Sequence, residues 1–467
     1  MAAMQHSSKL VSQPPNELGR AGTTSPRSSR LSAATPLEAS CLQELDRDTR
    51  IVAANAGDHP LILQLLVQAR QRSLAEDFQS HLDAPTYQPS DRLLLRRNGQ
   101  IIGHIQLARQ IGWFQKQRYP HTKLQDFIVL PEYQAAGYDE ALLKAAETVA
   151  ANEGSSLALM HTDQPDWFAQ RGWSHCHAQG YSRANTRAIL SHLDTRLAAP
   201  RRRCSLEIRS WRHFEIDSLQ QVYSQLSTNS WGMLHRSEET WQWLVGRKAH
   251  DQILIAVERA KQKTDESTSD LNVIGYAVVR DSCIVEMLTL PGYSAARTML
   301  IARACRDAID RDHHFVSLYT PASDPMHELL ITAGGNWVSN GATQGGQAML
   351  KLLSPGRWVE RLYPILHERA KEAGISLPLQ IDFQVSNTFQ RLTLTRRSAR
   401  LEQPTAPKIQ ASCDWHTFQS MLASNLTFRG TKKAALLRTT DTDITHTLAA
   451  LFPAKLFWQS PFPQLRL

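Results

Sequence analysis

Two segments of the chain share one pattern of apolar and polar positions. In each, an apolar strand that carries a single acid leads into Leu-Pro, a short polar turn and a helical run. The acids are Asp126 and Glu286, each five residues before the proline, and the Leu-Pro turns begin at Leu130 and Leu290, 160 positions apart. A spacing this long indicates a duplicated domain and excludes a short-period solenoid.

The surrounding elements recur in the same order in both copies. In the first copy, Asn98-Gly99 between two apolar runs predicts a two-residue β-hairpin turn, and the second copy has a longer polar loop there. After the Leu-Pro turn, both copies predict a helix, a short strand and a second helix that ends in glycine and tryptophan. The first of these helices are predicted at 140–149 and 299–309, and the strands at 157–162 and 315–320.

The chain of 467 residues is long enough for about three domains of ordinary size. Its hydrophobic fraction of 42% is sufficient for packed cores. Because the six cysteines are scattered without any CxxC pair, we expect neither a disulfide framework nor a metal site, and a cytoplasmic location is the simplest. No run approaches the ~18 apolar residues of a membrane helix, so we expect a soluble protein without a membrane span.

Composition divides the chain into four parts. Residues 1–48 are rich in Ser, Pro, Ala and Thr and predict a disordered tail; an Arg/Ser bias like that of a transit peptide is the weaker interpretation. A basic, proline-containing run near residue 198 separates the two copies, at 49–198 and 199–354. Residues 355–467 form a third segment, which opens on an amphipathic helix pattern.

Positive charge is concentrated in the third segment. Of the net charge of +8, residues 355–467 contribute +7, from 15 Lys/Arg and 8 Asp/Glu. Nucleic-acid binding is therefore a candidate function. However, the stretch 391–397 alternates basic and apolar residues as a strand with a solvated face does, and no nucleic-acid-binding motif is present. We therefore expect a solvated surface or an acidic ligand rather than nucleic acid.

The turn between Leu130 and the helix near Glu140 is a candidate anion site. Amide groups at a helix N-terminus have no partner within the helix, and the helix dipole adds partial positive charge. Gly137 permits a positive φ angle and the close approach of phosphate oxygens. The simpler interpretation is that Gly137 only turns the chain, but strand, proline, turn and helix occur here in the order that an anion site requires.

Two motifs resemble those of the GNAT superfamily of N-acetyltransferases. The segment 134–139 is similar to the family's acetyl-CoA pyrophosphate loop, Gln/Arg-x-x-Gly-x-Gly/Ala, and departs from it at Asp139. The segment 168–173 is similar to the later Phe/Tyr-x-x-x-Gly-Phe motif. The resemblance implies binding of acetyl-CoA by the following residues: Ile128, Val129, Leu130, Gln134, Ala135, Ala136, Gly137, Tyr138, Asp139 and Phe168.

The second copy resembles the same fold but has Arg297 at the glycine position and Ser294 at the Gln/Arg position, so we interpret it as noncatalytic. Residues 355–467 are similar to the sterol-carrier-like module of Eis-type acetyltransferases. The resemblance implies an α/β (α+β) fold of tandem GNAT domains with mixed central sheets, followed by a smaller α+β domain. It also implies assembly into a homo-oligomer, whose interface no pattern in the chain indicates.

The resemblance implies direct transfer of acetyl from acetyl-CoA to a primary amine, with a base that deprotonates the amine. One candidate base is Asp126, which could instead be a strand carboxylate paired with Lys123 or Arg118. The other is the C-terminal carboxylate of Leu467, for which a frayed end is the alternative. Phe168 stands where Eis-type enzymes have a proton-donating tyrosine, so the acid is unassigned, and Tyr138 is a weak substitute.

Asp139 would lie close to the pyrophosphate, where like charges about 5 Å apart repel by roughly 1 to 3 kcal/mol, or would cap the following helix.

The expected acceptor is an amine-bearing small molecule or peptide; Asp126, Asp163 and Asp166 would suit a cationic one. The rival hypothesis is a catalytically eroded scaffold whose third domain binds a lipid or a partner protein. Consecutive residues at 174–177 point to opposite faces of a strand and cannot share a metal ion.

Overall fold

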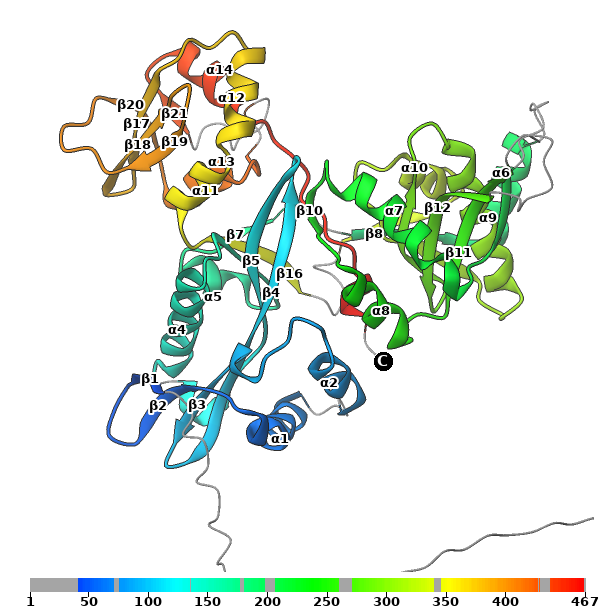
Figure 1. The fold of residues 1–467 in the computed structure, drawn as a ribbon, viewed down its shortest axis with the longest axis horizontal. Helices are drawn as coiled ribbons and strands as arrows, with labels where there is room; N and C mark the ends of the chain where they lie inside the picture. Colours follow the sequence, from blue (N-terminus) through cyan, green and yellow to red (C-terminus); the bar gives the residue numbers. More distant parts are fainter. Residues whose placement is uncertain are drawn as a thin grey trace, which may run out of the picture. The chain divides into compact units, whose positions relative to one another are not determined.

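The computed structural model describes residues 41–70, 75–134, 136–176, 180–197, 206–259, 271–339, 346–426, 428 and 437–465. Three sheets with flanking helices build this part of the chain (Figure 1). Parallel and antiparallel strand pairs occur in the same sheets, which confirms the predicted mixed α/β fold. Within these residues, no helix is long and apolar enough to cross a membrane.

The first sheet contains nine strands in the order β1-β2-β3-β4-β5-β6-β16-β7, with β10 paired to β4. In the predicted hairpin turn, Asn98 and Gly99 both have positive φ angles, as a two-residue turn requires. The strands are β1 Cys41–Glu44, β2 Thr49–Ala53, β3 Arg92–Arg97, β4 Gln100–Phe114, β5 Gln117–Val129, β6 Leu157–Thr162, β7 Ser174–His175, β10 Trp231–Leu234 and β16 Gln347–Leu352.

The strand β1 lies within the segment that composition assigned to a disordered tail. It pairs antiparallel with β2, so order begins no later than Cys41 rather than at residue 49. All four of its side chains are exposed. Backbone pairing rather than side-chain burial orders this strand, which is why composition did not indicate it. The rest of the predicted tail, residues 1–40, lies outside the described residues.

Helices cover both faces of the first sheet. Leu93 and Leu95 pack into the core under α4, whereas Leu94 packs into a separate cluster with α1. Because successive strand residues point to opposite faces, α4 and α1 cover opposite sides of the sheet. The helices are α1 His59–Arg70, α2 Ala75–Leu82, α3 Pro131–Gln134, α4 Tyr138–Asn152 and α5 Pro165–Ala169.

The second sheet contains seven strands in the order β15-β8-β14-β13-β12-β11-β9. Its strands are β8 Gly180–Asn185, β9 Leu206–Ser210, β11 Gln252–Arg259, β12 Leu271–Arg280, β13 Cys283–Thr289, β14 Phe315–Leu318 and β15 Asn336–Ser339, and its helices are α6 Thr186–Leu197, α7 Ile216–Ser227, α8 Glu238–Gly246, α9 Ser294–Ile309 and α10 Pro325–Thr332. The helix α9 stands after the second Leu-Pro turn as α4 does after the first.

The two sheets exchange a strand. β8 follows the first copy along the chain but pairs with β14 and β15 in the second sheet. β16 ends the second copy but lies between β6 and β7 in the first sheet. The division at residues 198 and 354 therefore describes the order of the copies along the chain. The hydrogen-bonded sheets cross it, because β8 of the first copy joins the second sheet, and β10 and β16 of the second copy join the first.

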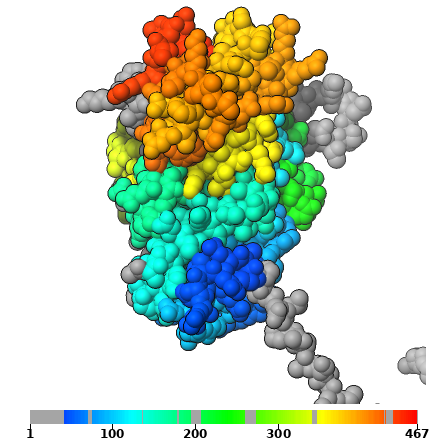
Figure 2. Space-filling view, turned by 90° about the vertical axis from the view of Figure 1, so that its left-hand side faces the viewer, coloured from blue at the N-terminus to red at the C-terminus, as the bar shows by residue number. Residues whose placement is uncertain are grey.

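The C-terminal module, residues 355–465, contains a five-stranded sheet in the order β19-β18-β17-β20-β21. Its core continues into the first sheet, since Trp358 packs against Phe114 and Tyr119, and Figure 2 shows its yellow and orange atoms adjoining the cyan and green ones. The elements are α11 Pro355–Arg361, α12 Tyr363–Glu372, β17 Leu379–Val385, β18 Thr388–Leu394, β19 Ala399–Glu402, β20 Ile409–Cys413, α13 Trp415–Leu422, β21 Arg438–Thr439 and α14 Thr442–Leu451.

The last described residues return from the C-terminal module to the second sheet's core, as the red trace in Figure 1 shows. The amide of Trp458 donates to the carbonyl of Trp231 at 2.9 Å. A Cβ on Gly232 would lie 2.7 Å from the Phe457 ring, so glycine is required for this close approach. The segment is thus packed rather than frayed as far as Leu465.

Candidate active site

The strands β5 and β6 separate after a short parallel pairing. The last paired residues are Leu124 and Met160, while β5 continues to Val129 and β6 to Thr162. The gap between the diverging strands opens into a cleft of about 1600 Å³. Backbone groups that would otherwise pair within the sheet are therefore directed into a cavity.

A β-bulge at Asp126 turns the lining strand. Asp126 has a left-handed φ of 51°, and the pairing of β4 with β5 shifts between His104 and Gln106. His104 Nδ1 lies 2.9 Å from the Asp126 carbonyl, which only accepts hydrogen bonds. The nitrogen Nδ1 therefore carries the proton, and Nε2 accepts from Arg92 Nη1 at 3.1 Å. This chain of hydrogen bonds holds the bulge in place.

The turn at Gly137 has the predicted left-handed conformation. Gly137 is the N-cap of α4, with φ of 76° and ψ of 12°. A Cβ at this position would meet no atom within 4 Å, so the backbone angle and not crowding by the protein favours glycine. Because α4 is 15 residues long, the positive end of its helix dipole lies beside the cleft. The Ala136 and Gly137 amides of the turn donate to the carbonyls of Tyr133 and Gln134, at 3.3 and 3.2 Å.

Asp139 does not occupy the N-cap position that sequence analysis gave it. The N-cap is Gly137, and Asp139 lies in the first turn, where its carboxylate accepts the Glu140 amide at 2.8 Å. Asp139 also lines the cleft. The Glu140 amide thus donates to the Asp139 carboxylate, whose negative charge would repel an anion bound at the turn.

Tyr138 points away from the cleft. Its hydroxyl donates to Asp46 at 2.6 Å, a contact that lowers the pKa of the Asp46 carboxyl to about 2. Tyr138 is not among the residues that line the cleft. Phe168 does line it, is 3% exposed and packs edge-on against Trp167, and it has no proton to donate.

The cleft brings together most of the site residues that the sequence predicted. Ala136, Gly137 and Asp166 do not line it, and Ala135 and Leu467 lie outside the described residues. The predicted residues that line it are Asp126, Ile128, Val129, Leu130, Gln134, Asp139, Asp163 and Phe168.

No sequence pattern indicated the residues that form the second wall of the cleft. The second copy contributes the hairpin between β12 and β13 together with Tyr319, and the C-terminal segment contributes up to Leu465. No local pattern predicts these contacts, because they join positions more than a hundred residues apart. The lining residues from these parts are Arg280, Asp281, Cys283, Val285, Tyr319, Gln459, Pro461, Gln464 and Leu465.

The first copy also contributes basic side chains that the sequence analysis did not select as site residues. Lys123 and His161 line the cleft on neighbouring strands. Burial lowers the pKa of Lys123 to about 7 against the attraction of the Asp126 carboxylate. Burial and the Lys123 charge lower the pKa of His161 to about 3. The sequence does contain one indication of these residues. Polar residues alternate at 121, 123 and 125, so one face of β5 is polar and does not belong to an apolar core.

Arg247, the C-cap residue of α8, holds the C-terminal segment at the cleft. Its guanidinium donates to the carbonyls of Pro463 and Leu465. The same guanidinium lies 3.7 Å from the Asp77 carboxylate of α2 and stacks 4.8 Å from the Trp243 ring centroid. Arg247 thus joins α2, α8 and the end of the chain on the wall opposite β5.

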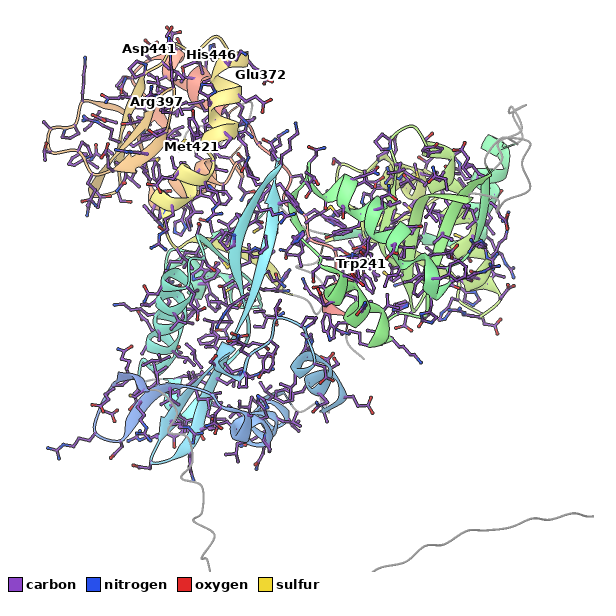
Figure 3. The ribbon with its side chains drawn as sticks, in the orientation of Figure 1. Trp241, Glu372, Arg397, Met421, Asp441 and His446 are labelled. Atoms are coloured by element: carbon purple, nitrogen blue, oxygen red, sulfur yellow. The ribbon has the colours of Figure 1, made fainter. Side chains whose placement is uncertain are left out.

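In the second copy, the acid that corresponds to Asp126 is part of the core. Glu286 is 0% exposed and forms two hydrogen bonds with Arg236, at 2.9 and 2.6 Å, and one with Tyr276. Burial alone would raise the pKa of Glu286, and the Arg236 guanidinium overrides it and lowers that pKa. Arg236 in turn lies 5.1 Å from the ring of Trp241, which Figure 3 labels on α8. This carboxylate is therefore structural.

No group of metal-binding side chains occurs in the described part of the chain. Ser174, from the segment 174–177, contacts His416 Nδ1 at 3.2 Å instead of an ion site, and His177 lies outside the described residues.

Comparisons with known proteins agree with this geometry. The acetyltransferase (GNAT) family profile matches residues 61–172, which include the bulge, the Gly137 turn and α5. No curated protein matches the sequence. Among solved structures, a GCN5-related N-acetyltransferase from Anabaena variabilis is 14% identical with a TM-score of 0.65, and one from Kribbella flavida is 13% identical with a TM-score of 0.64.

Eis1 from Mycobacterium abscessus is 16% identical, with a TM-score of 0.57. Each of these three likenesses covers 88% of this chain and 99% of the other. At such identities the likeness concerns the fold, and it extends through all three sheets. Residues 61–172 thus match the acetyltransferase (GNAT) family profile, and the chain has the fold of GNAT proteins of the Eis type.

Proposed function

We propose that the first copy transfers an acetyl group from acetyl-CoA to a primary amine. The observation that carries this proposal is the position of the Gly137 turn at the N-terminus of α4, beside the gap between β5 and β6. A diphosphate suits the turn, because the helix dipole at the start of α4 favours negative charge. Ile128, Val129 and Leu130, whose backbone lines the gap, would hold the acetyl and pantetheine portion.

These residues fit acetyl-CoA, and Asp139 weakens the fit. Open space at Gly137 leaves room for phosphate oxygens. When bound, acetyl-CoA supplies a thioester carbonyl carbon that accepts an amine. The Asp139 carboxylate repels a pyrophosphate about 5 Å away by roughly 1 to 3 kcal/mol. The substitution Asp139→Asn should therefore tighten acetyl-CoA binding by about five- to a hundredfold, and an unchanged affinity would place the phosphates elsewhere.

The acceptor is proposed to be a cationic amine on a small molecule or peptide. Carboxylates line the cleft from α2, β5, the end of β6 and the second copy. A positively charged acceptor is attracted to such a wall, and its far end reaches residues of both copies. The acidic lining residues are Asp77, Asp126, Asp163 and Asp281, together with Glu132 and Asp139 beside the turn.

Two carboxylates are proposed as the base that deprotonates the incoming ammonium. Asp126 lies at the bulge, inside the cleft. The carboxylate of Leu467 is the second, because Leu465 lines the cleft and two further residues span at most about 7 Å. Adding one glycine after Leu467 moves that carboxylate without changing any side chain. A full rate in that variant assigns the role to Asp126.

Isothermal titration of the full chain with acetyl-CoA tests the proposal, followed by release of free thiol in the presence of polyamines and aminoglycosides. Binding with turnover of at least one cationic amine supports it. Failure to bind acetyl-CoA at millimolar concentration refutes it.

A noncatalytic scaffold is the second candidate, favoured by Phe168 at the position of the family's tyrosine. The scaffold hypothesis predicts binding of acetyl-CoA without turnover for every amine.

For the C-terminal module we propose a sterol-carrier-like domain, supported by the five-stranded sheet and four helices of its described residues. In the scaffold hypothesis, this module would bind the lipid or partner.

A further inference from the structure

Lys123 lies at the closed end of the cleft, where β5 and β6 are still paired. Its Cα is opposite that of Leu159, one position before Leu124 and Met160, the last pair of the two strands. The next residue, Leu124, packs into the core under α4, so the Lys123 side chain points to the other face of the sheet. The side chain is 4% exposed and lines the cleft. A flexible amine is thus buried at the point where the strands begin to separate.

The surroundings of Lys123 do not neutralise its charge. The nearest opposite charge that acts on it is Asp126. His121 and His161 also feel the Lys123 charge, and burial keeps both of them uncharged near neutral pH.

Other charged groups of the cleft come from every element around it. They are Arg92 from β3, Asp77 and His81 from α2, Glu132 from α3, Asp139 from α4, Asp163 after β6, and Arg280 and Asp281 from the hairpin between β12 and β13. The C-terminal segment contributes the uncharged Gln459 and Gln464. Burial is the largest influence on Lys123 itself and brings its pKa to about 7. A substantial fraction of the amine is therefore neutral at physiological pH, as a proton acceptor requires.

We propose that Lys123 Nζ carries the proton that passes from the attacking amine to the leaving sulfur. This inference rests on the proposed acetyl transfer. As the N–C bond forms and the C–S bond breaks, the amine nitrogen loses one proton and the sulfur gains one. Lys123 accepts that proton as a neutral amine and returns it to the sulfur, so it ends uncharged. The first proton of the ammonium leaves through a carboxylate base. Lys123 thus supplies the acid function that Phe168 lacks.

The variants Lys123→Met and Lys123→Arg test this role, with Lys144→Met on the exposed face of α4 as the control. Arginine keeps the charge but stays protonated. We expect both Lys123 variants to lower kcat by about a hundredfold or more, with the dissociation constant of acetyl-CoA unchanged within about twofold. The rise of the wild-type rate between about pH 6 and 8 should be absent in both. Full activity in Lys123→Arg would overturn the proposal, because it would reduce Lys123 to a fixed charge.

The protonation state of Lys123 can also be measured without turnover. Trace labelling of the free protein with acetic anhydride across pH, read by mass spectrometry, follows the neutral fraction of each lysine. Half-maximal labelling of Lys123 near pH 7 supports the inference. Half-maximal labelling of Lys123 above about pH 9 contradicts it.

These measurements distinguish a failure of the proposed role of Lys123 from a failure of the proposed acetyl transfer. If the wild-type chain does not bind acetyl-CoA, the acetyl transfer itself fails. If the wild-type chain is active and Lys123→Met is equally active, only the role of Lys123 fails. Misfolding does not confuse the result, since removal of a buried ammonium should leave the melting temperature equal or higher. A lower melting temperature together with weakened acetyl-CoA binding would mark Lys123 as structural and overturn the inference.

Discussion

Arg297 of the second copy forms an ion pair with Asp324, the N-cap residue of α10. Arg297 stands at the position that Gly137 occupies in the first copy, and burial lowers its pKa. The side chain that replaces the glycine is thus held across the start of a helix. Arg297 lies in the first turn of α9, whereas Gly137 precedes α4 as its N-cap.

The ion pair predicts one acetyl-CoA per chain. The second copy should not bind the cofactor, because the Arg297 side chain and its partner Asp324 replace the open glycine turn of the first copy. Isothermal titration should give a stoichiometry of one, and Gly137→Val should remove that single site. Two sites of similar affinity would contradict this reading of the second copy.

Replacing Gly137 by alanine should weaken acetyl-CoA binding by about tenfold. Alanine in the left-handed region costs about 1 to 2 kcal/mol, which the turn can relieve by leaving the geometry that receives the phosphates. Gly154→Ala is a matched control, because Gly154 also has a left-handed φ and open space around it but ends α4. The control should lose similar stability and keep its affinity. Equal affinity losses in both variants would exclude a specific role for Gly137.

Glu286→Gln should destabilise the chain by about 3 to 5 kcal/mol. It leaves the Arg236 guanidinium buried without its countercharge, and removal of one partner from a buried pair has about this cost. The change can be measured by urea denaturation of the second sheet, followed through tryptophan fluorescence. Glu140→Gln breaks a pair whose carboxylate side is 61% exposed and should cost at most about 1 kcal/mol. Similar losses would argue against a structural Glu286.

Arg247→Met should release the end of the chain from the cleft. The variant loses the donor to the Pro463 and Leu465 carbonyls, so we expect faster removal of C-terminal residues by carboxypeptidase. If the Leu467 carboxylate is the base, kcat should fall at least about tenfold while acetyl-CoA affinity is kept. Arg357→Met removes a comparable guanidinium-to-carbonyl bond to Ala151 and should change neither.

Stability should fall in mild acid because of His121. Burial lowers the pKa of His121 to about 3, against about 6.5 in the unfolded chain. The unfolded state therefore binds a proton first, and stability present above pH 6.5 is lost as the pH falls toward 3. This one group should cost about 2 kcal/mol at pH 5. His121→Gln should reduce the loss between pH 7 and 5 in urea titrations, whereas exposed His175→Gln should not.

Local patterns were sufficient for the features that depend on neighbouring residues. The alternation of apolar residues, the Leu-Pro turns and the helical runs predicted mixed α/β units, and Asn98, Gly99 and Gly137 have the predicted positive φ angles. Backbone sterics act over one or two residues, so such features can be read directly from the chain. The same reasoning explains the predicted contrast between Gly137 and Arg297.

Contacts between distant residues required the folded chain. Backbone pairing of β8 and β16 has no side-chain signature, so the strand exchange could not be predicted. The burial of Lys123 depends on what covers its strand, and only the folded chain shows Arg280 and Leu465 in the same cleft. Burial sets the charge state of such a group, because desolvation disfavours the charged form. The residue types were visible in the sequence, but the environment that determines their chemistry arises only when distant segments pack together.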